Sequence, residues 1–231
     1  MEIDRDALKQ RLDSVRERIA AACRNSGRPE SSVRLVAVSK TKPVEMIRAA
    51  LELGQLEFGE NYAQELRDKA ALLTDPAIRW HFIGSLQRNK VKYLIGRVAM
   101  IHSVDSRPLL EEIDKRASDG NMRAPVLLEV KLSEEETKTG IDPGALFGLA
   151  ELALGGKAVE LKGLMTMPPY FPDPEQSRGY YARLRKVKDD LEQRLKVNLP
   201  ELSMGMSNDF EVAIAEGATM VRVGAAIFGA R

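Results

Sequence analysis

The chain has 231 residues, of which 44% are hydrophobic and 30% are charged. This length and balance are typical of one large soluble domain, or two small ones, with enough apolar material for a sizeable core. The 35 Lys and Arg residues nearly balance the 34 Asp and Glu residues, leaving a net charge of +1. Neither a nucleic-acid surface nor another polyanionic partner is therefore expected.

The cysteine and histidine content limits location and metal chemistry. Cys23 is the single cysteine, so no disulfide within the chain is expected and a reducing compartment is favoured. The first residues are charged with mixed sign, unlike a secretory signal, and no apolar run is long enough for a membrane span. We therefore expect a cytoplasmic protein without a membrane partner. His81 and His102 have no second ligand at metal-site spacing, so both are expected to be structural and no metal site is predicted.

The predicted elements alternate along the chain. An amphipathic helix is predicted over residues 4–25, where five apolar residues recur at helical spacing: Leu8, Leu12, Val15, Ile19 and Ala22. Eight short apolar runs follow that are typical of buried strands, at residues 33–39, 56–60, 80–84, 100–104, 126–132, 161–167, 202–204 and 220–224. Helices are predicted to begin near Pro43, Tyr62, Asn89, Arg107, Pro143, Pro174 and Asp209. Glycines are expected to end helices at Gly54, Gly96, Gly120, Gly155 and Gly217.

Eight strands that alternate with helices predict an α/β fold, a (β/α)8 TIM barrel of about 230 residues. Residues 1–231 then form a single domain, in which residues 1–30 supply an extra N-terminal helix that packs on the barrel. Seven residues follow the eighth predicted strand, so no closing eighth helix is expected and the N-terminal helix is expected to cover that gap. An open doubly wound sheet is the alternative, which the lack of a Gly-rich dinucleotide fingerprint weakens.

Lys40 is the most informative residue, because an apolar strand carries it out of the core and straight into a βα turn. Ligands bind at this edge of the sheet in α/β proteins. A desolvated amine there can lose its proton and attack an aldehyde to form a Schiff base. The alternative is a surface lysine whose apolar stem covers the strand end.

The ends of the seventh and eighth strands have the features of a phosphate site. Ser207 offers a hydroxyl just before a predicted helix, whose free N–H groups attract phosphate. Gly224 lets the backbone approach an anion closely. The alternative, in which Ser207 or Asn208 only caps the helix and Gly224 only turns the chain, is equally compatible with the sequence.

Arg222 is harder to explain by packing alone. Strand alternation places it on one face with Met220 and Gly224, and a buried guanidinium there needs a partner. That partner is either a core carboxylate, such as Glu60 or Glu129, or a ligand. We favour the ligand.

Six motifs in order carry a family resemblance: AVSKTKP at 37–43, FGENY at 58–62, WHFIGSLQRNK at 80–90, KGLMTM at 162–167, SMGMSND at 203–209 and VRVG at 221–224. Together they resemble the pyridoxal phosphate homeostasis protein family. The resemblance runs from the first strand to the end of the chain. It implies a single-domain barrel like the N-terminal domain of alanine racemase, of the fold-type III group, with pyridoxal 5'-phosphate (PLP) as its cofactor.

The resemblance also implies seven cofactor-binding residues, which are Lys40, Asn61, Met204, Ser207, Arg222, Gly224 and Ala225. By it, Lys40 holds PLP as an internal aldimine, while Ser207 and the backbone at Gly224 and Ala225 hold the phosphate. Arg222 would face the pyridine nitrogen, and Asn61 and Met204 would line the ring. Spacing leaves Lys42 open as a second attachment point.

Family members are understood to bind and buffer PLP, so the expected function is vitamin B6 and amino-acid homeostasis, with apo-enzymes as candidate recipients. A racemase of this fold needs two acid–base groups, and racemases take the second from a C-terminal domain, which we do not expect here. An arginine at the pyridine nitrogen also weakens the electron sink of PLP. We therefore expect a monomeric carrier with no catalytic residues. The alternatives are a PLP-dependent enzyme with weak amino-acid racemase activity and a cofactor-free lysine aldolase.

Overall fold

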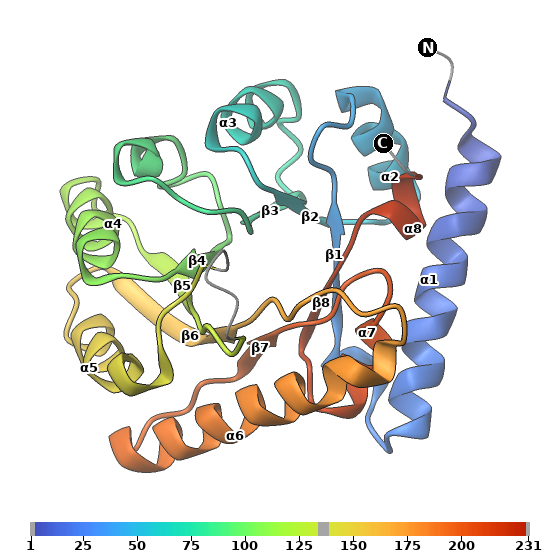
Figure 1. Cartoon of the computed structure of the whole chain (residues 1–231). Helices are drawn as coiled ribbons and strands as arrows, with labels where there is room; N and C mark the ends of the chain where they lie inside the picture. The colour runs from blue at the N-terminus through green and yellow to red at the C-terminus, as the bar shows by residue number, and fades with distance from the viewer. Residues whose placement is uncertain (1–2, 134–138, 230–231) are drawn as a thin grey trace.

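Eight parallel strands pair in chain order around the centre of the molecule (Figure 1). They are β1 (Arg34–Val38), β2 (Glu57–Glu60), β3 (Arg79–Phe82), β4 (Met100–Val104), β5 (Ala124–Glu129), β6 (Val159–Met165), β7 (Glu201–Ser203) and β8 (Met220–Val223). Because β8 pairs with β1, the sheet closes into the predicted barrel, and the open-sheet alternative is wrong. This computed structural model describes residues 3–133 and 139–229.

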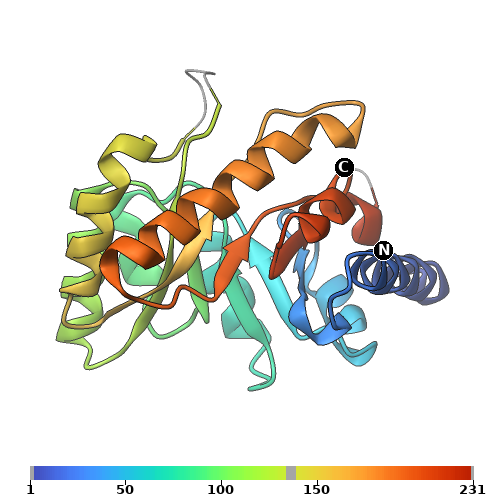
Figure 2. The same cartoon turned by 90° about the horizontal axis from the view of Figure 1, so that it is seen from below.

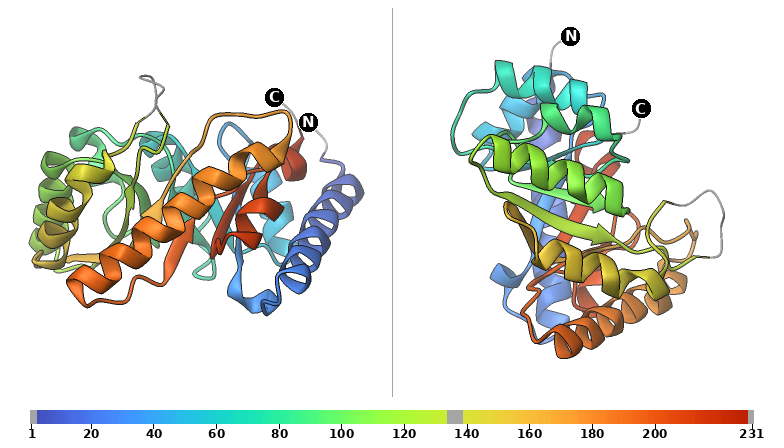
Figure 3. Two further views of the ribbon diagram at one scale, coloured as in Figure 1. Left: turned by 60° about the horizontal axis from the view of Figure 1, so that its bottom comes forward. Right: turned by 90° about the vertical axis from the view of Figure 1, so that its left-hand side faces the viewer.

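Helices follow the strands and form the outer layer (Figure 3). They are α1 (Arg5–Asn25), α2 (Val44–Glu52), α3 (Ala63–Leu72), α4 (Arg107–Asp119), α5 (Pro143–Leu154), α6 (Arg178–Leu195), α7 (Phe210–Ala215) and α8 (Ala225–Phe228). The described residues also form the 3₁₀ helices η1 (Glu30–Ser32), η2 (Arg88–Tyr93) and η3 (Pro174–Ser177). The helix predicted from near Asn89 is thus only a 3₁₀ helix. Across the two described ranges, no helix combines the length and apolarity needed to cross a membrane.

Helix α1 lies on the outside of the barrel, beside α7 and α8 (Figure 2). Its five predicted core positions are all buried, namely Leu8, Leu12, Val15, Ile19 and Ala22. The expectation of no eighth helix is wrong in one respect, since a single turn, α8, fits after β8. That turn is too short to cover its side of the barrel, and α1 packs against it. Arg11 Nε donates to the Ile227 carbonyl at 2.7 Å and ties the two together.

The barrel interior mixes apolar and polar side chains. A small apolar cluster inside contains Val36, Met100, Leu127, Met165 and Met220. Side chains alternate along β8, so Met220 and Arg222 share the inner face, as predicted, and the valines between them join the outer core. Polar groups buried beside such a cluster require hydrogen-bond partners, and those partners define the site described next.

Candidate functional site

A cavity of about 200 Å³ lies at the carboxyl ends of β1, β2 and β8. Six of the seven residues predicted from the family resemblance line it: Lys40, Asn61, Ser207, Arg222, Gly224 and Ala225. They come from the ends of four strands, which is where (β/α)8 barrels place their chemistry. A second cavity of about 190 Å³ is also lined by Lys40, together with Thr41 and Lys42. The fold therefore brings a lysine, an arginine and two small residues to one small cavity.

A larger cavity of about 570 Å³ lies between the segments after β5 and β6 and helix α6. It is lined by Leu132, Tyr180 and Arg183 among others, and it contains none of the predicted residues. Chemistry rather than size identifies the candidate site, because the described lining of the larger cavity has no lysine, whereas Lys40 lines the smaller one.

Met204 is the predicted residue that does not line the cavity. Its side chain is fully buried in the outer core, because Ser203 before it faces the barrel interior and successive side chains alternate. Gly205 then turns the chain with φ +90°, and Met206 reaches the cavity instead. A β-carbon at Gly205 would lie 2.6 Å from Ala213 Cβ, so this turn requires glycine.

Lys69 on α3 holds the backbone just before Lys40. Its Nζ donates to the Ser39 carbonyl at 2.7 Å and to Glu60 Oε1 at 2.8 Å, and the Ser39 hydroxyl donates to the same carboxylate at 2.6 Å. Burial raises the pKa of Glu60, although its bonds to Lys69 and Ser39 oppose that rise. Sequence reasoning did not find Lys69, whose one signal was its i,i+4 spacing from Glu65 on a helix facing the strand end.

Thr41 holds the backbone just after Lys40. Its φ of +63° lies in the left-handed region, which a β-branched residue rarely occupies. Its N–H donates to Glu65 Oε1 at 2.6 Å, and Lys69 Nζ donates to the same oxygen at 2.7 Å. One cluster on β2 and α3 thus fixes both neighbours of Lys40.

Arg222 is buried, with 3% of its surface exposed, and its direct partners are neutral. Nη1 donates to Ser203 Oγ at 2.6 Å, and Nη2 donates to the Thr166 carbonyl at 3.0 Å. The two carboxylates considered as partners are engaged elsewhere: Glu60 pairs with Lys69, and Glu129 accepts from Thr139 at 2.6 Å. Burial lowers the pKa of Arg222, yet a guanidinium stays charged.

This leaves Arg222 with no ion pair in the part of the chain that the structure describes. A charged donor that faces a cavity and has only neutral partners is suited to an electron-rich acceptor on a ligand. The prediction that it faces a ligand rather than a core carboxylate agrees with this geometry.

Ser207, Gly224 and Asn61 present the remaining polar groups. Ser207 Oγ accepts from the Gly224 N–H at 3.2 Å, and Asp209 rather than Ser207 is the N-cap of α7. The capping alternative for Ser207 is therefore wrong. A β-carbon on Gly224 would lie 3.3 Å from the Val38 carbonyl, so the strand ends approach closely there. Asn61 Oδ1 is buried and accepts no hydrogen bond within the described residues, which suits a site completed by a ligand.

Comparison with known proteins places this geometry in a family. The model of the alanine racemase N-terminal domain matches residues 3–231. A curated pyridoxal phosphate homeostasis protein of Aquifex aeolicus is 49% identical over 222 residues, covering 96% of this chain and 97% of that protein. The chain belongs to the pyridoxal phosphate homeostasis protein family. A second family member, from Vibrio cholerae, is 38% identical over 229 residues, and the match covers 97% of this chain and 97% of that protein.

Solved structures agree with this family assignment. PipY of Synechococcus elongatus PCC7942, with PLP bound, superposes with a TM-score of 0.84 at 38% identity, covering 96% of this chain and 100% of that chain. The PLP-free form of PipY gives 0.85 at 39% identity, with the same coverage. An alanine racemase of Clostridium difficile superposes with a TM-score of 0.75 at 17% identity, and the match covers 57% of that chain. This likeness shows only that the two proteins share the barrel fold. The predicted fold and the predicted family are both confirmed.

Proposed function

We propose that this chain binds PLP in the cavity beside Lys40, as a Schiff base, and serves intracellular vitamin B6 and amino-acid homeostasis. The observation that carries the proposal is the convergence of six motif residues, from segments far apart in sequence, on one cavity that contains a lysine. Membership in the pyridoxal phosphate homeostasis family and the PLP-bound structure of PipY support it.

Each polar group of the cavity has a role in this proposal. Lys40 Nζ attacks the aldehyde carbon of PLP; a carbon–nitrogen double bond forms and the aldehyde oxygen leaves as water. Ser207 and the backbone at Gly224 and Ala225 bind the phosphate. Arg222 faces the pyridine nitrogen, and Asn61 lies against the ring.

The same cavity favours a carrier over an enzyme. Its described lining includes no Asp, Glu, His, Cys or Tyr that would act beside Lys40 as a second acid–base group. The Arg222 cation also disfavours a protonated pyridine nitrogen, and so weakens the electron sink that PLP chemistry uses. We infer a monomer in the cytosol that holds PLP and releases it to apo-enzymes, rather than one that turns over a substrate.

The decisive experiment is reduction of the PLP-loaded protein with borohydride, followed by mass mapping of the modified lysine. We expect one pyridoxyl group per chain, on Lys40, and its loss in Lys40→Ala. Lys42→Ala is the matched control, because Lys42 lies two residues away and also lines the adjoining cavity. Adducts spread over surface lysines in the wild type, or an unchanged adduct in Lys40→Ala, would contradict the proposal.

A second measurement separates carrier from enzyme. The loaded protein is mixed with an apo-enzyme that requires PLP, and the return of that enzyme's activity is followed against free PLP. Amino acids are incubated in parallel with the loaded protein in deuterated water. Recovery of the apo-enzyme without deuterium at any α-carbon is expected, whereas α-deuteration would favour the racemase alternative.

A further inference from the structure

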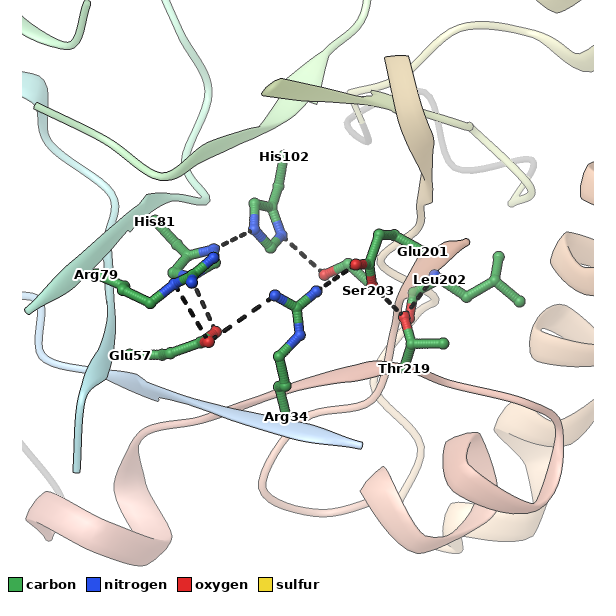
Figure 4. A network of polar contacts seen from close by, with 9 residues as sticks. All are labelled: Arg34, Glu57, Arg79, His81, His102, Glu201, Leu202, Ser203 and Thr219. Atoms are coloured by element: carbon green, nitrogen blue, oxygen red, sulfur yellow. Dashed lines mark hydrogen bonds and ion pairs between the residues drawn. The ribbon is translucent and has the colours of Figure 1, made fainter. Parts of the chain in front are cut away.

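A line of polar contacts crosses the barrel interior from Glu57, at the amino-terminal edge of the sheet, to Ser203 (Figure 4), and Arg222 contacts its Ser203 end. His81 Nε2 lies 3.0 Å from Glu57 Oε2, and His81 Nδ1 lies 2.9 Å from His102 Nε2. His102 Nδ1 lies 2.9 Å from Ser203 Oγ, which accepts from Arg222 Nη1 at 2.6 Å. Both imidazoles and the serine are fully buried, so water does not supply alternative partners.

Arg222, at one end of this line, determines which group is the donor in each hydrogen bond along it. Arg222 has only donors, so Ser203 Oγ must accept from it. The Ser203 hydroxyl proton is then satisfied if it is donated to His102 Nδ1. His102 consequently carries its own proton on Nε2 and donates it to His81 Nδ1, and His81 carries its proton on Nε2, toward Glu57.

The carboxylate end requires the same direction. Burial raises the pKa of Glu57, but its contacts with His81, Arg34 and Arg79 outweigh this, so the pKa lies below the usual value and the group is ionised. Burial above all, together with the charge of Arg222, holds the pKa of His102 well below its usual value, so that imidazole is neutral. An ionised carboxylate can only accept, which favours the His81 tautomer with its proton on Nε2.

The opposite direction fails at both ends. With His81 neutral, it would turn the His81 Nε2 lone pair toward the Glu57 carboxylate, and neither of these two atoms hydrogen-bonds elsewhere among the described residues. It would also make Ser203 Oγ accept from both His102 and Arg222. The hydroxyl proton of Ser203 would then be left without its acceptor on His102, at the cost of an unsatisfied buried group.

We propose that Glu57 is a positioning residue for Arg222 and acts on it from the far end of the barrel through His81, His102 and Ser203. Its charge fixes the direction of the whole line, and that direction keeps the Ser203 oxygen available to the guanidinium. The proposal rests on the proposed function in one respect, namely that Arg222 faces PLP.

The test compares two substitutions at the amino-terminal edge. Glu57→Gln keeps the shape of the side chain and removes its charge. Glu201→Gln removes a carboxylate that contacts the same Arg34, at 2.5 Å, but touches neither histidine. Both proteins are loaded with PLP for affinity measurements and absorbance spectra. Without PLP, the two histidines of the untagged chain are observed by nitrogen-15 NMR, which reports which ring nitrogen holds the proton.

We expect the wild-type spectrum to show both imidazoles neutral, with the proton on Nε2. Glu57→Gln is expected to change the His81 and His102 signals and to weaken PLP binding about tenfold, the size of effect seen for outer-shell partners elsewhere. Its absorbance band should also shift, because Arg222 is the group at the pyridine nitrogen. Glu201→Gln should stay within about twofold of the wild type in affinity.

Two results would overturn the proposal: a wild-type proton on His102 Nδ1, or a PLP affinity and spectrum in Glu57→Gln that match those of Glu201→Gln. The wild-type NMR spectrum needs no variant, so the direction of the line is decided even if Glu57→Gln fails to fold. Failure of the wild type to form a Lys40 adduct would instead overturn the proposed function, and the tautomers would still be measured without PLP.

Discussion

Thr41 shows how a single residue aims the candidate lysine. A β-branched residue at φ +63° is strained by about 1–3 kcal/mol, and it keeps that conformation because its surroundings impose it. The Glu65 carboxylate accepts a hydrogen bond from the Thr41 N–H. Lys69 donates both to this carboxylate and to the carbonyl of Ser39, the residue before Lys40. The turn is therefore held from both sides, and Lys40 lines the cavity as a result.

Removal of Lys69 should damage both stability and the Lys40 turn. Lys69→Met leaves the buried Glu60 without its cation, and loss of one partner of a buried pair costs about 3–5 kcal/mol. We expect a fall of that order in the free energy of unfolding, measured in urea, and slower formation of the reducible Lys40 adduct. Lys9→Met is the control, since it removes an exposed pair with Asp13 on α1. Equal stability of the two variants would refute the role of the cluster.

At the scale of the elements, apolar runs predicted all eight strands, and their ends moved by at most a few residues. The run at 126–132 illustrates why, since β5 spans Ala124–Glu129 and its last predicted residues have left the sheet. Val130 forms only an isolated bridge with Ile141. An apolar run predicts that a segment is buried, but not that it is a strand, because a loop packed under other loops is also buried.

The link between β7 and α7 shows what the sequence motif alone left undetermined. From the motif SMGMSND at 203–209 the resemblance predicted that Met204 lines the site, but the turn geometry, which the motif does not give, decides which side chain faces inward. The structure places Met206 there and Met204 in the outer core. The Lys69 cluster and the line of contacts to Glu57 were also missed, since both join residues that only the folded barrel brings together.

Gly205→Ala tests the turn between β7 and α7. The new methyl group would lie 2.6 Å from Ala213 Cβ and 2.9 Å from Phe210 Cα, so α7 must move away. Gly217→Ala is a matched control, with φ +100° but only a flexible Arg185 side chain nearby, at 3.4 Å. We expect about 1 kcal/mol of destabilisation for the control and clearly more for Gly205→Ala, measured by urea unfolding. Equal losses would mean that crowding at Gly205 is unimportant.

At the scale of the whole molecule, a fully buried histidine makes folding sensitive to acid. His102 stays neutral in the folded barrel because burial, above all, holds its pKa well below 6.5. The unfolded chain binds a proton there near pH 6.5 and the folded chain does not. The free energy of unfolding therefore falls as the pH drops below about 6.5, by up to about 1.4 kcal/mol per pH unit from this group.

The contribution of His102 is isolated by comparison with His102→Gln, which cannot titrate. Urea unfolding between pH 7 and pH 5 should show a shallower loss of stability in this variant than in the wild type, although its starting stability is lower. Carboxylates titrate in both proteins and cancel in the difference. Identical pH slopes would show that His102 takes up a proton in the folded state as readily as in the unfolded chain.

The pairing of β1 with β8 also has a consequence during synthesis on the ribosome. Lys40 emerges early, on the first strand, whereas Arg222 and Gly224 emerge with the last strand, which must pair with β1 before the cavity exists. A nascent chain therefore carries the Lys40 amine long before the cavity beside it is complete. PLP bound in this cavity would contact residues that follow both β1 and β8, the first and last strands of the barrel. Only a chain that has paired these two strands could then bind PLP in this way.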